Sequence, residues 1–323
     1  MQAAPLSVMR DDGSLDAGHG AALSDELAVA LYEHMVLART LDERVVALQH
    51  GGSVASHSSA IGEEATIVGA VAAMHDEDWV FPSSREFAAA LWRGMPLAAY
   101  AHHVMGSARD AGKGHNAPDP PFWKAARVAS VSPLAGTHIP HAVGAAWAAR
   151  IQKHDVAALL FFGEGATSSG DFHTGMNFAG VTRAPIVAVC RNNGWATSMP
   201  ASRQTHSDGF AIKAIAYGLR GVRVDGADVI AVLGVVRDAR VRAAAGEGGT
   251  LVEAVIPGIA QVDPVARMRR HLEARGLWDG DREKRLAGEI GADVDRALTE
   301  AVAAGPPAPG TLFEDVVAGG QTP

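Results

Sequence analysis

The sequence predicts an α/β fold with a mostly parallel sheet, helices on both of its faces, and a helical C-terminal extension. Between residues 127 and 255, short apolar runs alternate with segments of helical pattern, an order typical of a parallel sheet covered by helices. The runs are apolar almost throughout, as expected of strands that are buried on both faces. After Pro264 the pattern is helical until GPPAPG, residues 305–310, interrupts it.

These patterns divide the chain into three parts. Residues 1–22 are rich in Gly, Asp and Ala, and we expect them to form a flexible N-terminal segment. Residues 23–304 are expected to form one α/β domain with helical additions, a length that can bury a sizeable core. Residues 305–323 are expected to form a C-terminal tail.

The helical additions come first in the chain. Ser24 and the two acids after it provide an N-cap and a negatively charged first turn for a helix of about 25 residues that ends at Gly51. Further helices are predicted at 60–74, 86–93 and 97–105, a short strand at 79–81, and a polar loop at 106–124. In the α/β part, strands are predicted at 127–131, 156–162, 186–190, 221–224 and 250–255, and helices at 138–153 and 171–181.

Composition excludes several classes of function. The formal charge is −8 and no basic stripe is present, so we expect no nucleic-acid partner. No apolar run approaches the roughly 20 residues that cross a bilayer, and the N-terminus lacks the apolar core of a signal peptide, so we expect no membrane association. The single cysteine, Cys190, cannot form an internal disulfide, which favours a reducing compartment, the cytoplasm.

A carboxylate stands between two glycines where one apolar strand ends. Gly163-Glu164-Gly165 follows the strand at 156–162, and Asn193 follows the next strand along the chain. If these strands are neighbours, Glu164 and Asn193 face one crevice, because ligands bind beyond the carboxyl ends of parallel strands. Oxygen ligands suit Mg²⁺, and a helix N-terminus suits an anion. The pattern predicts a metal-bound diphosphate, although two ordinary turns explain the same spacing; Ser168 excludes a dinucleotide fingerprint.

The segment GEGATSSGDFHTGMNFAGVTRAPIVAVCRNNGWATS, residues 163–198, resembles the thiamine-diphosphate motif of 2-oxo acid dehydrogenases. It is similar to the alpha subunit of their decarboxylating first component, and the CRNNGW run is similar to the branched-chain type. FPSSRE at 81–86 and SPLAGTHIPHAVGAAWAA at 132–149 extend the resemblance. It implies a thiamin-diphosphate-binding fold and oxidative decarboxylation of a 2-oxo acid with acyl transfer to a lipoyl group. The implied partners are a beta subunit, in a heterotetramer of two alpha and two beta chains, and a lipoyl acyltransferase.

The resemblance also implies roles for individual residues. Glu164, the side chain of Asn193 and the backbone carbonyl of Trp195 resemble the Mg²⁺ ligands. The cofactor-binding set that the resemblance implies is Arg85, Leu134, Gly163, Glu164, Gly165, Ala166, Arg191 and Asn193. Within it, the arginines would hold phosphate oxygens, since a guanidinium is planar and permanently charged, and Leu134 would lie beside the aminopyrimidine. A glutamate that activates the aminopyrimidine normally comes from the beta subunit, so this chain would hold half of a site.

Two departures from the family leave alternatives open. Ser84 stands where the family has a tyrosine. The chain also lacks a loop that carries a histidine beside the cofactor: it passes from Ile256 directly to Asp263-Pro264, and no histidine lies between His206 and His271. One alternative is therefore a catalytically divergent or non-catalytic subunit, and another is a pyruvate or acetoin dehydrogenase alpha subunit.

Several polar residues have simpler structural explanations. Arg85 could be a solvated surface arginine, and Arg191 could cap a strand end. The pair Glu63-Glu64 is most simply explained as complementing a helix dipole. Structural roles are also predicted for His102, His103, His138 and His141, and a loop charge for Lys113.

Overall fold

The computed structural model describes residues 4–16, 23–116 and 120–314. Its centre is a five-stranded sheet in which every neighbouring pair is parallel, with the order β1-β2-β3-β7-β6. The strands are β1 (Trp79–Phe81), β2 (Ala158–Gly163), β3 (Ile186–Asn192), β6 (Arg220–Asp225) and β7 (Thr250–Val255). The predicted parallel sheet is confirmed, and so is the adjacency of the two strands that precede Glu164 and Asn193.

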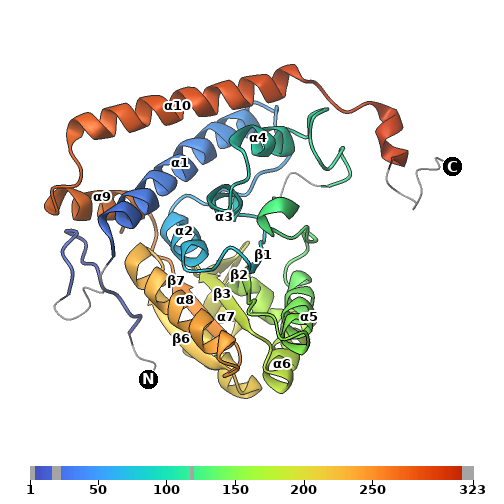
Figure 1. The fold of residues 1–323 in the computed structure, drawn as a ribbon, viewed down its shortest axis with the longest axis vertical. Helices are drawn as coiled ribbons and strands as arrows, with labels where there is room; N and C mark the ends of the chain where they lie inside the picture. Colours follow the sequence, from blue (N-terminus) through green and yellow to red (C-terminus); the bar gives the residue numbers. More distant parts are fainter. Residues whose placement is uncertain (1–3, 17–22, 117–119, 315–323) are drawn as a thin grey trace.

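Helices cover both faces of this sheet (Figure 1). On one face lie α2 (Glu64–Ala72) and α8 (Val229–Ala244), and on the other α5 (His138–Ile151) and α6 (Gly170–Thr182). Alternate strand residues point to opposite faces: Leu159 and Phe161 join the core under α2 and α8, whereas Leu160 and Phe162 join the core under α5 and α6. The central strands β2 and β3 are almost entirely apolar because each face of the sheet has its own buried core.

The helical additions pack on the α2 side. There, α1 (Asp25–His50) begins at Ser24, whose side chain accepts from the amide of Leu27 (3.2 Å). The predicted C-terminal extension is present as α9 (Pro264–Ala274) and α10 (Gly280–Ala303), and α10 runs along α1 and α4 (Leu97–Met105). The short α3 (Phe87–Trp92) lies beneath them. The remaining short elements are η1 (Lys124–Ala126), η2 (Glu164–Ser168), β4 (Trp195–Ala196), β5 (Met199–Pro200), α7 (Ala201–Gln204), η3 (Ala211–Tyr217) and η4 (Pro309–Phe313).

The strand predicted at 127–131 is wrong. Residues 124–126 form η1, and Arg127 has a left-handed backbone (φ 55°), which interrupts an extended chain. Val128 alone bridges to the edge strand, at Val80, and to Trp123. The neighbouring edge strand β1 is only three residues long, so it offers too few backbone groups for residues 127–131 to form a strand beside it.

The N-terminal segment also differs from the prediction over residues 4–16. Leu6 extends the sheet by one parallel bridge to Val224, donating to Arg223 O (3.0 Å) and accepting from the amide of Asp225 (2.9 Å). Val8 and Met9 are buried. Composition predicted flexibility because the segment is polar on average, whereas its few apolar residues pack at one place. Residues 17–22 lie outside the described residues, and so do 315–323 of the predicted tail.

Candidate functional site

A cleft of about 350 Å³ opens beyond the carboxyl ends of β1, β2 and β3. Four segments line it: 83–85 after β1, 132–138 before and at the start of α5, 162–166 at the end of β2, and 191–197 at the end of β3. Every site residue predicted from the sequence lies on its wall: Arg85, Leu134, Gly163, Glu164, Gly165, Ala166, Arg191, Asn193 and Trp195. Predicted site residues as far apart in the sequence as Arg85 and Trp195, 110 positions, thereby line the same cleft.

The strand register explains why Glu164 and Asn193 meet. Gly163 is paired with Arg191 across β2 and β3, so the residues that follow each strand leave the sheet at the same edge. Beyond Gly163 the chain turns through η2, and α6 begins at Ser169, whose hydroxyl accepts from the amide of Phe172 (3.2 Å). This local geometry places a carboxylate and an amide side by side at the ligand-binding edge of a parallel sheet.

The two glycines around Glu164 have different functions in the fold. A Cβ built at Gly165 would lie 2.6 Å from the Cβ of Ala196, so this glycine lets the β4–β5 hairpin pack against η2. A Cβ built at Gly163 meets no described atom within 4 Å, although Gly163 lines the cleft. Protein packing does not require glycine at position 163, whereas a ligand that approaches the backbone closely would.

Glu164 is buried without a full set of partners. Its side chain is 1% exposed, and its Oε1 atom has no hydrogen-bond partner among the described residues. Burial raises the pKa of this carboxyl, and the nearby charge of Glu63 raises it further. A buried carboxylate oxygen without a partner is costly unless a cation or donor meets it. The described residues form no cluster of three or more His, Cys, Asp or Glu around a metal position, so a cation beside Glu164 would draw on amide, backbone, phosphate or water oxygens.

The two arginines of the cleft are held by carboxylates. Arg191 is buried, with Nε 2.6 Å from Glu86 Oε1, Nη2 donating to Ser83 Oγ (2.7 Å), and Nη1 paired with Glu63. Arg85 donates from Nη1 to Glu63 Oε1 (2.9 Å). Its side chain is only 33% exposed, and its buried Nε has no partner in the described part of the chain. The surface interpretation of Arg85 and the simple strand-capping interpretation of Arg191 are therefore wrong.

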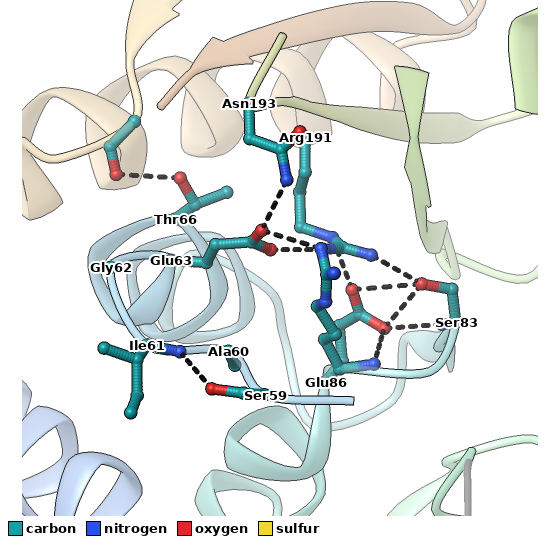
Figure 2. A network of polar contacts seen from close by, with 12 residues as sticks. Ser59, Ala60, Ile61, Gly62, Glu63, Thr66, Ser83, Glu86, Arg191 and Asn193 are labelled. Atoms are coloured by element: carbon teal, nitrogen blue, oxygen red, sulfur yellow. Dashed lines mark hydrogen bonds and ion pairs between the residues drawn. The ribbon is translucent and has the colours of Figure 1, made fainter. Parts of the chain in front are cut away.

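Glu63 is the site residue that sequence reasoning missed (Figure 2). It stands at the N-cap of α2, yet its side chain makes no cap hydrogen bond there and is directed to Arg85, Arg191 and the amide Nδ2 of Asn193 (3.4 Å). Burial opposes its ionisation, but the guanidiniums of Arg191 and Arg85 outweigh burial and hold the pKa of the Glu63 carboxyl below its ordinary value. The dipole interpretation does not describe Glu63, whose charge is paired in the cleft. Glu64 lies in the first turn of α2, as that interpretation expects, and also pairs with Arg39 (2.5 Å). No local pattern could have revealed partners that lie 22 to 130 residues away.

The histidines fall into two groups. His102 and His103 are buried in α4 and bonded to Ser107 (2.7 Å) and Asp110 (3.0 Å), which confirms their structural role. His138 lines the cleft, where its ring Nε2 donates to the carbonyl of Phe161 (2.6 Å), burial lowers its pKa, and its buried Nδ1 has no partner among the described residues. His141 is exposed on α5.

The remaining predictions concern loops. Lys113 is a loop charge, paired with Glu314 (2.8 Å). Ser84 lines the cleft where the resemblance expects a tyrosine. The short connection from β7 to α9 begins at Ile256, whose amide donates to the carbonyl of Asn192 (2.8 Å), so the chain returns to α9 directly beside the cleft strands.

Comparison with known proteins finds one matching family and several relatives that are similar over most of the chain. Residues 32–256 match the model of the family described as Dehydrogenase E1 component. The 2-oxoisovalerate dehydrogenase subunit alpha 2, mitochondrial, of Arabidopsis thaliana is 34% identical, over 91% of this chain and 67% of its own. The bovine (Bos taurus) 2-oxoisovalerate dehydrogenase subunit alpha is 35% identical, over 91% and 70%. The 3-methyl-2-oxobutanoate dehydrogenase subunit alpha of Mycobacterium tuberculosis is 38% identical, over 87% and 81%.

Proposed function

This chain belongs to the dehydrogenase E1 component family, and we propose that it is the alpha subunit of a branched-chain 2-oxo acid dehydrogenase. The reaction is the oxidative decarboxylation of a branched-chain 2-oxo acid with transfer of the acyl group to a lipoyl group. One observation carries the proposal: a buried acceptor without a partner, Glu164 Oε1, and a buried donor without a partner, Arg85 Nε, belong to residues of the same cleft within the described part of the chain. A cation bound to a phosphate would satisfy both atoms.

The cleft residues fit Mg²⁺ and thiamine diphosphate. Glu164, Asn193 and the carbonyl of Trp195 would hold the metal, which prefers oxygen ligands. The guanidiniums of Arg85 and Arg191 would bind phosphate oxygens, and the backbone at Gly163, Gly165 and Ala166 would approach them closely. Leu134, which is exposed in the cleft, would pack against the aminopyrimidine. When bound, thiamine diphosphate supplies the electron sink that decarboxylation of a 2-oxo acid requires.

The comparisons favour this function over its alternatives. The relatives are named for 2-oxoisovalerate and 3-methyl-2-oxobutanoate, which favours a branched-chain substrate over pyruvate or acetoin. A non-catalytic subunit has no need for a buried, incompletely paired Glu164, because such a carboxylate destabilises the fold unless a ligand compensates.

The partners that we propose are a beta subunit, in an assembly of two alpha and two beta chains, and a lipoyl acyltransferase. A contiguous apolar patch on α5 and α6 supports a protein partner. The α5–α6 patch consists of Trp147, Ile151, Phe178 and Val181, which are exposed although large and apolar. Within the described residues, none of the helices has the length and hydropathy of a membrane span. The cytoplasm remains our proposed location, supported by the single buried cysteine.

The test is an assay of the chain co-expressed with a beta subunit and supplied with Mg²⁺ and thiamine diphosphate. Decarboxylation of 3-methyl-2-oxobutanoate and pyruvate is measured with an artificial electron acceptor, so no lipoyl partner is needed. We expect turnover above the cofactor-only background, with 3-methyl-2-oxobutanoate preferred. Absence of turnover with bound cofactor would instead support the non-catalytic alternative, and a preference for pyruvate would support the pyruvate alternative.

A matched pair of variants tests the site itself. Glu164→Ala removes the only proposed carboxylate ligand and should abolish metal-dependent cofactor binding, measured by calorimetric titration of the complex. Glu64→Gln is the control, because Glu64 is equally buried but is paired with Arg39 outside the cleft. Unchanged binding in Glu164→Ala would show that the cofactor site lies elsewhere.

A further inference from the structure

Two carboxylates and two guanidiniums form one network at the cleft wall, in which the arginines line the cleft and the glutamates are buried (Figure 2). Glu63 pairs with both Arg85 and Arg191, and Glu86 pairs with Arg191 and accepts from Ser83 Oγ (3.0 Å). Glu63 is 4% exposed and Glu86 is fully buried. Only Glu63 reaches a proposed metal ligand, since its Oε1 accepts from Asn193 Nδ2 (3.4 Å).

We propose that Glu63 is a positioning residue that presets Asn193 for the metal and makes diphosphate binding depend on that metal. The inference rests on the proposed function, because it assigns Glu63 a task toward the cofactor of that same cleft. It has two parts, one concerning the orientation of an amide and one concerning charge.

The orientation of the Asn193 amide follows from its two neighbours. An ionised carboxylate can only accept hydrogen bonds, so the NH₂ group of Asn193 must face Glu63. The amide oxygen then faces the opposite way, where it accepts from the amide N–H of Trp195 (3.0 Å). If the Asn193 amide were flipped, its oxygen would face the carboxylate of Glu63 and its NH₂ group would face the N–H of Trp195, and both contacts would be repulsive. Glu63 therefore keeps an oxygen, the atom type that a hard cation requires, on the side of Trp195, whose carbonyl is the other proposed ligand.

The charge argument concerns the arginines. Inside this network, the charges of Glu63 and Glu86 cancel those of Arg85 and Arg191, and Glu164 adds one uncompensated negative charge to the cleft wall. Such a wall attracts a divalent cation and offers little net attraction to a bare diphosphate. The cation must bind with the diphosphate to reverse the sign. Glu63 thus neutralises arginine charge that would otherwise attract a diphosphate in the absence of metal.

The experiment compares Glu63→Gln with Glu64→Gln in the chain co-expressed with its beta subunit. Both variants remove one buried carboxylate that is paired with an arginine, but only Glu63 touches the cleft network. Mn²⁺ affinity in the presence of thiamine diphosphate is read from the loss of the free-ion EPR signal. Thiamine diphosphate binding without metal is measured by equilibrium dialysis in EDTA.

In Glu63→Gln we expect Mn²⁺ affinity to fall about 10- to 100-fold, the usual effect of losing a residue that orients a metal ligand. The affinity for thiamine diphosphate without metal should not fall, because the variant no longer neutralises the charge of Arg85 and Arg191 with a carboxylate at position 63. Glu64→Gln should change neither. Loss of Mn²⁺ affinity with metal-independent binding retained supports the inference, whereas parallel loss of both, or unchanged Mn²⁺ affinity, overturns it.

Two further controls keep the outcomes distinct. If the unmodified complex binds neither Mn²⁺ nor thiamine diphosphate, the proposed function fails first. If Glu63→Gln does not fold, as judged by circular dichroism, Glu63→Asp takes its place. Aspartate keeps the charge but shortens the reach to Asn193 Nδ2, so a loss of Mn²⁺ affinity is again expected, and an unchanged affinity overturns the orientation argument.

Discussion

At the scale of single residues, two buried glutamates show that the groups beside a carboxyl determine whether its pKa is lowered or raised. Glu63 has the pKa of its carboxyl lowered by two guanidiniums, whereas burial raises that of Glu164, whose Oε1 lacks a partner among the described residues. The oxygens of Glu63 are bonded to protein groups, whereas Oε1 of Glu164 is left for a ligand. Sequence pattern and resemblance predicted Glu164, because it stands in a motif. They could not predict Glu63, whose contacts to Arg191 and Asn193 join residues 128 and 130 positions apart.

The glycines beside Glu164 provide a residue-scale prediction. Gly163→Ala should leave the free energy of unfolding within about 0.5 kcal/mol, because the new methyl group meets no described atom within 4 Å and Gly163 has an ordinary φ of −74°. It should nevertheless weaken thiamine diphosphate binding. Gly165→Ala should cost about 1–3 kcal/mol by forcing the β4–β5 hairpin away. Thermal melts and calorimetric titrations of the two variants check this, and equal losses of stability would contradict it.

At the scale of elements, most strands and helices were predictable because each carries its own periodicity or cap. The helix α8 was not predicted, although Asp228 caps its start. The two apolar runs predicted β2 and β3, and Ser24 predicted the start of α1, whereas the adjacency of β2 and β3 was a condition that only the structure supplies. The strand expected at 127–131 failed because pairing depends on what lies beside it, and β1 is only three residues long. Whether a segment forms a strand depends on the strand beside it, and the sequence of the segment alone does not contain that information.

Asp228 provides an element-scale prediction, because it serves two elements at once. Its carboxylate caps α8 through the amides of Ile230 and Ala231, and it also accepts from the amides of Val8 (2.7 Å) and Met9 (2.6 Å). Asp228→Ala should lower the free energy of unfolding by about 2–4 kcal/mol, the sum of a lost cap and two unsatisfied buried amides. Hydrogen exchange should also accelerate over residues 4–16.

The matched control for this prediction is Asp279→Ala. Asp279 caps α10 through the amides of Asp281 and Arg282, but it is exposed and, within the described part of the chain, holds no second segment. It should cost about 0.5–2 kcal/mol, the value of a cap alone, and leave exchange at residues 4–16 unchanged. Similar exchange in both variants would mean that Asp228 does not anchor the N-terminal segment.

A second element-scale prediction concerns acid. Burial opposes ionisation of Asp263, the N-cap of α9, but Arg39 and the backbone amides at the start of the helix hold the pKa of its carboxyl below the ordinary value. Its stabilisation is therefore complete above the unfolded pKa of about 3.9 and is lost as pH falls through the lower folded pKa. The difference in Tm between the unmodified protein and Asp263→Asn should be constant near neutral pH and narrow below about pH 4. A constant difference would contradict this.

At the scale of the whole molecule, the sheet separates a closed side from an open one. The helices α1 and α3 pack on α2, and α4 and α10 pack further out on the same side (Figure 1). The opposite helices α5 and α6 leave large apolar side chains exposed. This asymmetry indicates that a partner protein covers the exposed apolar side chains of α5 and α6.

The α5–α6 patch provides a prediction at this scale. Val181→Asp should prevent co-purification with the beta subunit while leaving the helical content of the chain unchanged, because the side chain is 78% exposed. Val241→Asp is the control: Val241 is 59% exposed but lies on α8, away from the patch. If both variants co-purify equally well with the beta subunit, the partner binds another face.

The bridge between Leu6 and Val224 has a consequence for the order in which the protein is made. Leu6 leaves the ribosome before its docking site on β6, which is made more than two hundred residues later. The sheet edge that Leu6 occupies therefore cannot be closed early in synthesis, and Met9 cannot reach its buried position until α9, which follows β7, supplies Arg267. Residues 4–16 can therefore make all of these contacts only after the chain as far as Arg267 has been synthesised, so they dock after the strands of the sheet have been made.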